Sequence, residues 1–84
     1  MTDTEMRIKQ YILDECLPGE NPALLTEDTP LITGGILDSI STMKLVMFLE
    51  EEFGVSIEAH EMSPDHLNTI ARVARTVESK RQPT

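Results

Sequence analysis

Aromatic residues are almost missing from this sequence of 84 residues, which has no tryptophan, one tyrosine and two phenylalanines. The core must therefore rest on aliphatic side chains and on methionine, which packs adaptably and recurs at surfaces that accept several partners. A chain of this length predicts one domain with marginal stability, because it buries little more than half of the surface that its unfolded form exposes.

Cysteine occurs once, as Cys16, which excludes an internal disulfide and favours a reducing compartment. Residues 1–14 lack the apolar stretch of a secretory signal, and no apolar run approaches the length of a membrane span. We therefore expect a soluble cytoplasmic protein.

Basic residues are also few, with seven against 15 acidic residues and a net charge of −8. Between Asp14 and Asp65 there are twelve acids and one base, Lys44, whereas four of the seven bases lie in the last thirteen residues. This acidic surface repels the phosphates of nucleic acids and anionic membranes, and it favours encounter with basic protein surfaces. We expect a monomer that binds neither nucleic acid nor membrane.

Apolar residues at helical spacing predict a first helix over residues 3–16 and a last helix that is capped by Asn68 or Thr69 and ends near residue 79. A Ser-Pro pair at 63–64 predicts the start of a short helix through about residue 67. Residues 80–84 are expected to be frayed.

The connection over residues 17–38 is long and contains three of the four glycines. Leu31 and Ile32 are apolar within a polar stretch, so we expect them to pin this connection to the core. A further helix is predicted over residues 39–53. The fold class is therefore all-α: a small four-helix bundle of three longer helices and one short helix, with a long loop between the first two.

The helix predicted over residues 39–53 carries two apolar stripes. One stripe is predicted to face the core and contains Leu45, Leu49 and Phe53. The other begins directly after Ser39 and lies on a different side of the helix. It is a candidate contact surface, and the alternative is partial packing against the third helix. Its residues are Ile40, Met43 and Met47.

Ser39 lies where a loop with the Gly34-Gly35 pair turns into a helix. Its hydroxyl is expected beside the first N–H groups of that helix, where the helix dipole favours negative charge. A phosphate ester on Ser39 would be well placed there. Taken alone, the Asp38-Ser39 pair favours an ordinary helix start with Asp38 as the N-cap, because such pairs are common there.

Five parts of the chain form a wider pattern around Ser39: residues 29–31 (Thr-Pro-Leu), Gly35, 37–40 (Leu-Asp-Ser-Ile), 49–54 (Leu-Glu-Glu-Glu-Phe-Gly) and 63–70 (Ser-Pro-Asp-His-Leu-Asn-Thr-Ile). With these segments the sequence resembles, over essentially its whole length, the acyl carrier and peptidyl carrier proteins. This resemblance implies that Ser39 carries 4′-phosphopantetheine from coenzyme A, and that Asp38 helps to place the metal-bound coenzyme A in the enzyme that loads it.

The resemblance implies a protein that holds acyl or aminoacyl intermediates as a thioester and presents them to partner enzymes. Its implied partners are a phosphopantetheinyl transferase, an acyl- or aminoacyl-activating enzyme, and a downstream synthase or acyltransferase. Lys44 and residues 62–67 depart from the usual fatty-acid type, which favours a specialised carrier in lipid or secondary-metabolite biosynthesis. Five residues match the family's partner-facing positions: Ile40, Met43, Met47, Glu50 and Glu51.

No constellation of residues indicates an enzyme, since the sequence has neither a glycine-rich phosphate loop followed by lysine nor a plausible catalytic triad. His60 and His66 do not have the spacing of a closed metal-ligand set, so we expect no metal. On this interpretation residues 1–84 form a single carrier domain with a core of about residues 3–79. The alternative is an unmodified acidic helical interaction module, which would not need the Ser39 hydroxyl.

Overall fold

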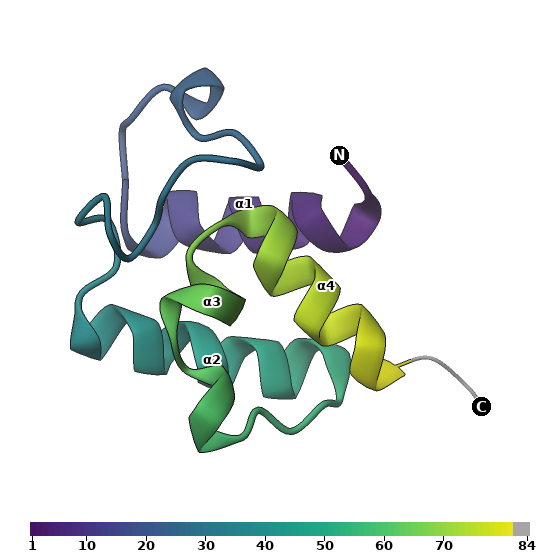
Figure 1. Cartoon of the computed structure of the whole chain (residues 1–84). Helices are drawn as coiled ribbons and strands as arrows, with labels where there is room; N and C mark the ends of the chain where they lie inside the picture. Colours follow the sequence, from purple (N-terminus) through teal and green to yellow (C-terminus); the bar gives the residue numbers. More distant parts are fainter. Residues whose placement is uncertain (82–84) are drawn as a thin grey trace.

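The computed structural model describes residues 1–81, which form helices and loops and no strand. Helices α1, α2 and α4 pack together, and the short α3 packs against α4 (Figure 1). This arrangement confirms the predicted all-α bundle with a long loop after the first helix. Its elements are α1 (Asp3–Glu15), the 3-10 turn η1 (Pro22–Leu24), α2 (Ser39–Phe53), the 3-10 turn η2 (Ala59–Glu61), α3 (Pro64–Leu67) and α4 (Ile70–Arg81).

Local capping sets the bounds of the two long N-terminal helices. Thr2 and Glu5 form a capping box at the start of α1, in which each side chain accepts a hydrogen bond from the other residue's backbone N–H. Asp38 caps the start of α2, and Gly54 ends α2 in the left-handed conformation at φ +67°. The predicted bounds of α2 are therefore confirmed, and α1 ends one residue before the predicted position.

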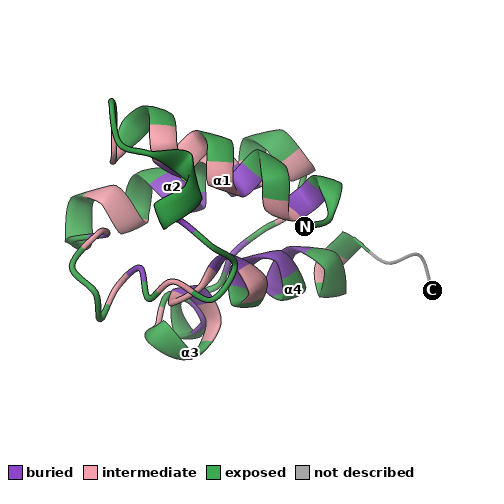
Figure 2. Ribbon diagram, turned by 90° about the horizontal axis from the view of Figure 1, so that it is seen from above, coloured by how far each residue is buried: buried purple, intermediate pink, exposed green. Residues whose placement is uncertain are grey.

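The core is aliphatic, as the lack of aromatic residues predicted. Buried residues of α1, α2 and α4 face one another across the middle of the bundle (Figure 2). Leu45 and Leu49 of the predicted core stripe are fully buried, and Phe53 is half-buried at the edge. Each large aliphatic side chain buried in this way contributes roughly 1.5–3 kcal/mol. The fully buried side chains are Ile8, Ile12, Leu25, Leu31, Leu45, Leu49, Leu67, Ile70, Val73 and Val77.

The long loop is packed against the bundle. Leu25, Leu31 and Leu37 are buried in the same core as the helices, which confirms the prediction for Leu31, while Ile32 is half-buried. The backbone N–H of Leu31 donates to the carbonyl of Asn68 at 2.6 Å. Main-chain hydrogen bonds and buried leucines together fix this long connection against the bundle.

The end of α4 differs from the prediction. The helix continues through Arg81, so the expected fraying is wrong for residues 80 and 81; residues 82–84 lie outside the described residues. Lys80 forms an ion pair with Glu61 at 2.6 Å, and the guanidinium of Arg81 lies 5.4 Å from the centroid of the Phe53 ring. These contacts hold the last turn, where cations also suit the helix dipole.

One end of the bundle brings together the start of α1 and the ends of α2 and α4. Arg7 of α1 forms an ion pair with Glu52 of α2 at 2.5 Å. A small cavity there is lined by residues of all three helices, including Asp3, Phe53 and Arg81. Within residues 1–81, no helix has the length and apolar character that crossing a membrane requires.

Candidate functional site

The start of α2 is held by Asp38. Its Oδ1 accepts the backbone N–H of Ser41 at 2.7 Å, and its carbonyl accepts both the backbone N–H and the hydroxyl of Thr42, at 2.9 and 2.7 Å. The hydrogen bond from the Ser41 backbone lowers the pKa of the Asp38 carboxyl. Asp38 is therefore ionised at neutral pH and carries an exposed negative charge beside Ser39.

Ser39 is the first residue of α2, and its side chain is exposed. The first-turn N–H groups of a helix have no partners within the helix, so an anion bonded to Ser39 would find hydrogen-bond donors and a favourable dipole. Figure 1 shows the start of α2, where the long loop enters the helix. The position is reached easily by a partner protein.

Two glycines shape the approach to Ser39. A Cβ at Gly34 would lie 2.3 Å from the carbonyl oxygen of Pro30, so only glycine allows the backbone to pass that close. Gly35 has φ +83°, a backbone conformation that residues with a side chain rarely adopt. The loop then closes with a hydrogen bond from the Leu37 N–H to the Leu31 carbonyl at 2.8 Å. This tight turn leads directly to Asp38.

An open cleft of about 470 Å³ lies beside Ser39. Asp38 lies in its lining, and several apolar side chains from the loop, from α2 and from the α3 region form its walls. An exposed hydroxyl at a helix start, with a mainly apolar cleft next to it, fits a phosphate ester that continues into a flexible arm. The lining residues are Ile32, Leu37, Asp38, Ser39, Thr42, Met43, Met62 and Pro64.

Sequence reasoning did not identify Ile32, Met62 or Pro64 as neighbours of Ser39. These residues come from the loop and from the region around α3, and only the tertiary fold brings them to the start of α2. No local pattern in the sequence signals this proximity. The Ser-Pro start of α3 was recognised, but the side chain of Ser63 makes no capping hydrogen bond, and its hydroxyl lies 3.5 Å from Nδ1 of His66.

The second apolar stripe of α2 is exposed. Ile40, Met43 and Met47 have exposed fractions of 68%, 61% and 59%, so the helix presents these side chains to solvent and does not pack them against α3. Met43 also lines the cleft beside Ser39. Large apolar side chains grouped on an exposed helix face suit contact with a partner protein.

The acidic end of α2 divides into residues with different roles. Glu50 is half-buried, and its Oε2 accepts the backbone N–H of Ile57 at 2.9 Å, which holds the segment after the helix. Glu52 is engaged by Arg7. Glu51 is exposed on the helix surface. The hydrogen bond of Glu50 and the ion pair of Glu52 offset the unfavourable interaction of these acids with the C-terminal end of the helix dipole.

His60 belongs to a group of possible metal ligands that differs from the pair seen in the sequence. Ligand atoms of Glu58, His60 and Glu61 lie within 4.8 Å of one another. Glu61 is already engaged, because its Oε1 accepts the Glu58 N–H at 2.9 Å and the Lys80 ammonium at 2.6 Å. These bonds account for the cluster, and exposed acidic groups of this kind are common without a metal.

The environment of Cys16 disfavours a reactive thiol. It is half-buried at the end of α1, and burial raises the pKa of its thiol. Since the thiolate is the reactive form, this environment makes Cys16 less reactive than a free cysteine.

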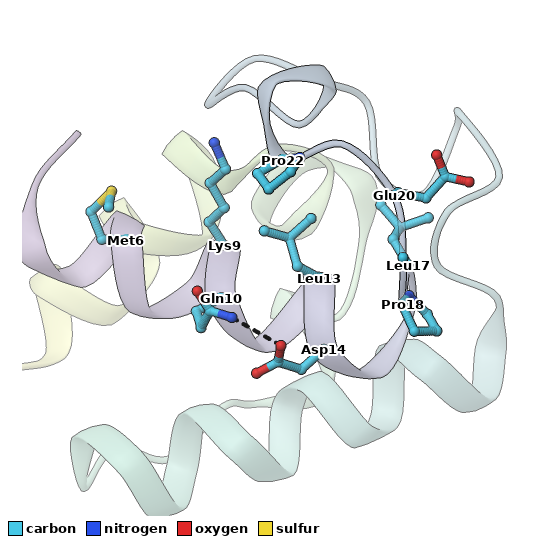
Figure 3. A pocket seen from close by; sticks show the side chains of 10 residues that line it. Met6, Lys9, Gln10, Leu13, Asp14, Leu17, Pro18, Glu20 and Pro22 are labelled. Atoms are coloured by element: carbon cyan, nitrogen blue, oxygen red, sulfur yellow. Dashed lines mark hydrogen bonds between the residues drawn. The ribbon is translucent and has the colours of Figure 1, made fainter.

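A second cleft, of about 490 Å³, lies between the outer side of α1 and the loop that follows it (Figure 3). Leu13, Leu17 and Pro22 line it, and Gln10 donates a hydrogen bond to Asp14 at 2.9 Å on its α1 side. Ser39 does not line this cleft. No arrangement of a nucleophile with a base is found among its lining residues.

Comparison with known proteins places this geometry in context. The family described as "Phosphopantetheine attachment site" matches residues 8–77. D-alanyl carrier proteins of Streptococcus pyogenes serotype M5 (strain Manfredo) and serotype M1 are each 33% identical over 51 residues, which are 61% of this chain and 65% of the relative. The match therefore spans slightly less than two thirds of these relatives.

A solved structure shares the fold. A chain in a crystal structure described as that of an FAD-dependent dehydrogenase is 33% identical and superposes with a TM-score of 0.76. The match covers 83% of this chain and 97% of that chain.

Proposed function

Because the chain belongs to the phosphopantetheine attachment family, in which 4′-phosphopantetheine is bound covalently, we propose that it is an acyl carrier protein that bears this group on Ser39. Family membership confirms the predicted cofactor and the prediction of a carrier rather than an enzyme. The observation that supports Ser39 most directly is its exposed position at the start of α2, beside the cleft and inside the matched region.

The chain's own residues suit the loading step. Within the transferase, the Ser39 oxygen would bond to the phosphorus of coenzyme A that carries pantetheine as the bond from that phosphorus to the nucleotide's phosphate oxygen breaks. The Ser39 proton and adenosine 3′,5′-bisphosphate would leave as products. The first N–H groups of α2 then lie beside the new phosphodiester charge. Asp38 is ionised and held in place by Ser41. We assign to Asp38 the placement of the metal-bound donor within the transferase.

The attached group supplies a flexible thiol that holds an acyl or aminoacyl cargo as a thioester. The protein supplies presentation, because docking makes each transfer effectively intramolecular. A chain with an exposed apolar stripe and a net charge of −8 suits weak, charge-steered docking, which allows release after each transfer. We assign this docking to Ile40, Met43, Met47 and Glu51, with Glu50 mainly supporting the helix end.

The partners that follow from this role are a phosphopantetheinyl transferase, an activating enzyme that loads the cargo, and a synthase or acyltransferase that receives it. The D-alanyl carrier relatives favour a specialised carrier with an aminoacyl or short acyl cargo. Lys44 on α2 agrees with this assignment, because it places a positive charge next to the stripe, where carriers of fatty-acid synthesis tend to have an acid. We also propose that the protein is a cytoplasmic monomer, which agrees with its single free cysteine.

The test is the intact mass of the purified protein before and after incubation with a promiscuous phosphopantetheinyl transferase and coenzyme A, with peptide mapping of the product. We expect one phosphopantetheinyl group on Ser39 and none on the Ser39→Ala variant. Ser41→Ala is the matched control, because it changes a serine in the same helical turn and should still be labelled. If folded wild-type protein gains no mass with several transferases, the alternative of an unmodified interaction module replaces this proposal.

A further inference from the structure

Three successive backbone N–H groups of the long loop donate to a single residue, Asn68. Leu31 donates to the backbone carbonyl of Asn68 at 2.6 Å, and Ile32 and Thr33 both donate to its side-chain Oδ1 at 2.9 Å. The Asn68 amide nitrogen donates back to the Thr33 hydroxyl at 3.1 Å. Both the oxygen and the nitrogen of the Asn68 side-chain amide thus form hydrogen bonds with the loop.

Asn68 itself has a fixed position. It ends α3, where its N–H donates to the Pro64 carbonyl at 3.1 Å, and α4 begins two residues later. Leu67 and Ile70 on either side are fully buried. Asn68 therefore joins the loop to a part of the chain that the core holds firmly.

The segment held by Asn68 controls the approach to Ser39. Leu31 receives the hydrogen bond that closes the turn at Leu37, and Leu37 directly precedes the cap residue Asp38. Ile32 forms part of the wall of the cleft beside Ser39. Release of residues 31–33 would therefore loosen both the start of α2 and one wall of the cleft.

Another part of the cleft wall is anchored at the same junction. Pro64 lines the cleft, and its carbonyl accepts a hydrogen bond from Nη1 of Arg72 in α4 at 3.2 Å. The cleft is thus framed by two segments, both tied to the region where α3 meets α4. The Asn68 side chain supplies the tie on the loop side.

From these contacts we propose that Asn68 is a positioning residue for phosphopantetheine attachment: its side chain holds residues 31–33 so that Ser39 and the cleft are presented to the transferase in one geometry. This inference rests on the proposed function. The side-chain oxygen is the essential group, because it accepts two backbone N–H groups that would otherwise lose their partner. Asp keeps such an oxygen, whereas Ala does not.

The experiment compares wild type, Asn68→Ala and Asn68→Asp, with Ile12→Val as a control that weakens the core but removes none of the hydrogen bonds between the loop and Asn68. In Asn68→Ala we expect amide hydrogen exchange of Ile32 and Thr33 to be about tenfold faster or more, since two donors lose their acceptor. We expect kcat/KM for transferase labelling to fall about fivefold or more through KM, as for a competent state occupied about one fifth of the time. Asn68→Asp should restore both values.

The outcomes separate the two proposals. If wild type is not labelled, the proposed function fails, and the positioning role fails with it. If wild type is labelled and folded Asn68→Ala is labelled with the same KM, or Ile12→Val shows an equal rise in KM, the positioning role alone is overturned. If Asn68→Ala does not fold, Asn68→Ser shortens the side chain, so that its oxygen no longer lies where Oδ1 accepts the Ile32 and Thr33 N–H groups, and an unchanged KM in this milder variant would also overturn the role.

Discussion

Gly34→Ala should both destabilise the fold and disturb the site, because the added Cβ would lie 2.3 Å from the carbonyl oxygen of Pro30. The obstructing atom belongs to the backbone, so the loop itself must move. Overpacking of this kind costs roughly 1–3 kcal/mol. Replacing glycine by alanine also lowers the conformational entropy of the unfolded chain, which stabilises the fold by roughly 0.4–1 kcal/mol. We therefore expect a net destabilisation of about 1–2 kcal/mol, and the loop must shift immediately before Ser39.

Gly19→Ala is the matched control. Gly19 also has a positive φ, +84°, but a Cβ there meets nothing within 4 Å. Alanine in this left-handed conformation costs roughly 1–2 kcal/mol of stability. As at position 34, the lower conformational entropy of the unfolded chain offsets part of this cost. The two variants should therefore have similar stability, while Gly34→Ala alone displaces the turn at the site.

The assay combines thermal unfolding followed by circular dichroism with the rate of phosphopantetheinyl transfer. For a domain of this size, each 1 kcal/mol lowers Tm by roughly 4–8 °C. We expect Tm to fall in both variants and the transfer rate to fall in Gly34→Ala alone. A Gly34→Ala protein with wild-type Tm, or equal transfer rates in the two destabilised variants, would refute the reasoning.

Two further predictions concern the ion pair and the exposed stripe. The hydrogen bond from the Lys80 ammonium holds the pKa of Glu61 below its ordinary value of 4.5. This ion pair therefore stabilises the fold above pH 4.5, and its contribution is lost as the pH falls through the lower pKa of the folded state. In an acid titration, Lys80→Met should lose less stability below about pH 4.5 than wild type does. Leu49→Ala should cost about 2–5 kcal/mol in urea unfolding because Leu49 is fully buried, whereas Met47→Ala should change stability by less than about 0.5 kcal/mol, and equal losses would show that the stripe is packed.

The sequence predicted those elements that are set by neighbours along the chain. The bounds of α2 follow from Asp38 and Gly54, which act within one turn of the helix ends. The exposed stripe follows from helical spacing, because a helix in so small a bundle cannot bury two faces. Fold class and the position of Ser39 needed no knowledge of tertiary contacts.

The sequence did not predict features that depend on distant residues. Asn68 or Thr69 was expected to cap α4; Thr69 does so, accepting the Arg72 N–H at 3.1 Å, while Asn68 bonds to residues 35 and 36 positions earlier. The turn η2 and the continuation of α4 depend on Glu61 and Lys80 meeting across the fold. Such pairings leave no periodic or local signal in a single sequence.

The gathering of three helix ends has a practical consequence for handling this protein. Asp3 and Arg81 lie together at the end of the bundle where α2 finishes, whereas Ser39 is at the other end of that 15-residue helix, about 22 Å away at 1.5 Å per residue. An affinity tag, a fluorophore or a solid support joined at a residue beside Asp3 or Arg81 would thus lie on the side opposite the serine. Immobilised molecules would face incoming enzymes with Ser39 outermost, so binding and transfer can be measured on a surface without the anchor standing in the way.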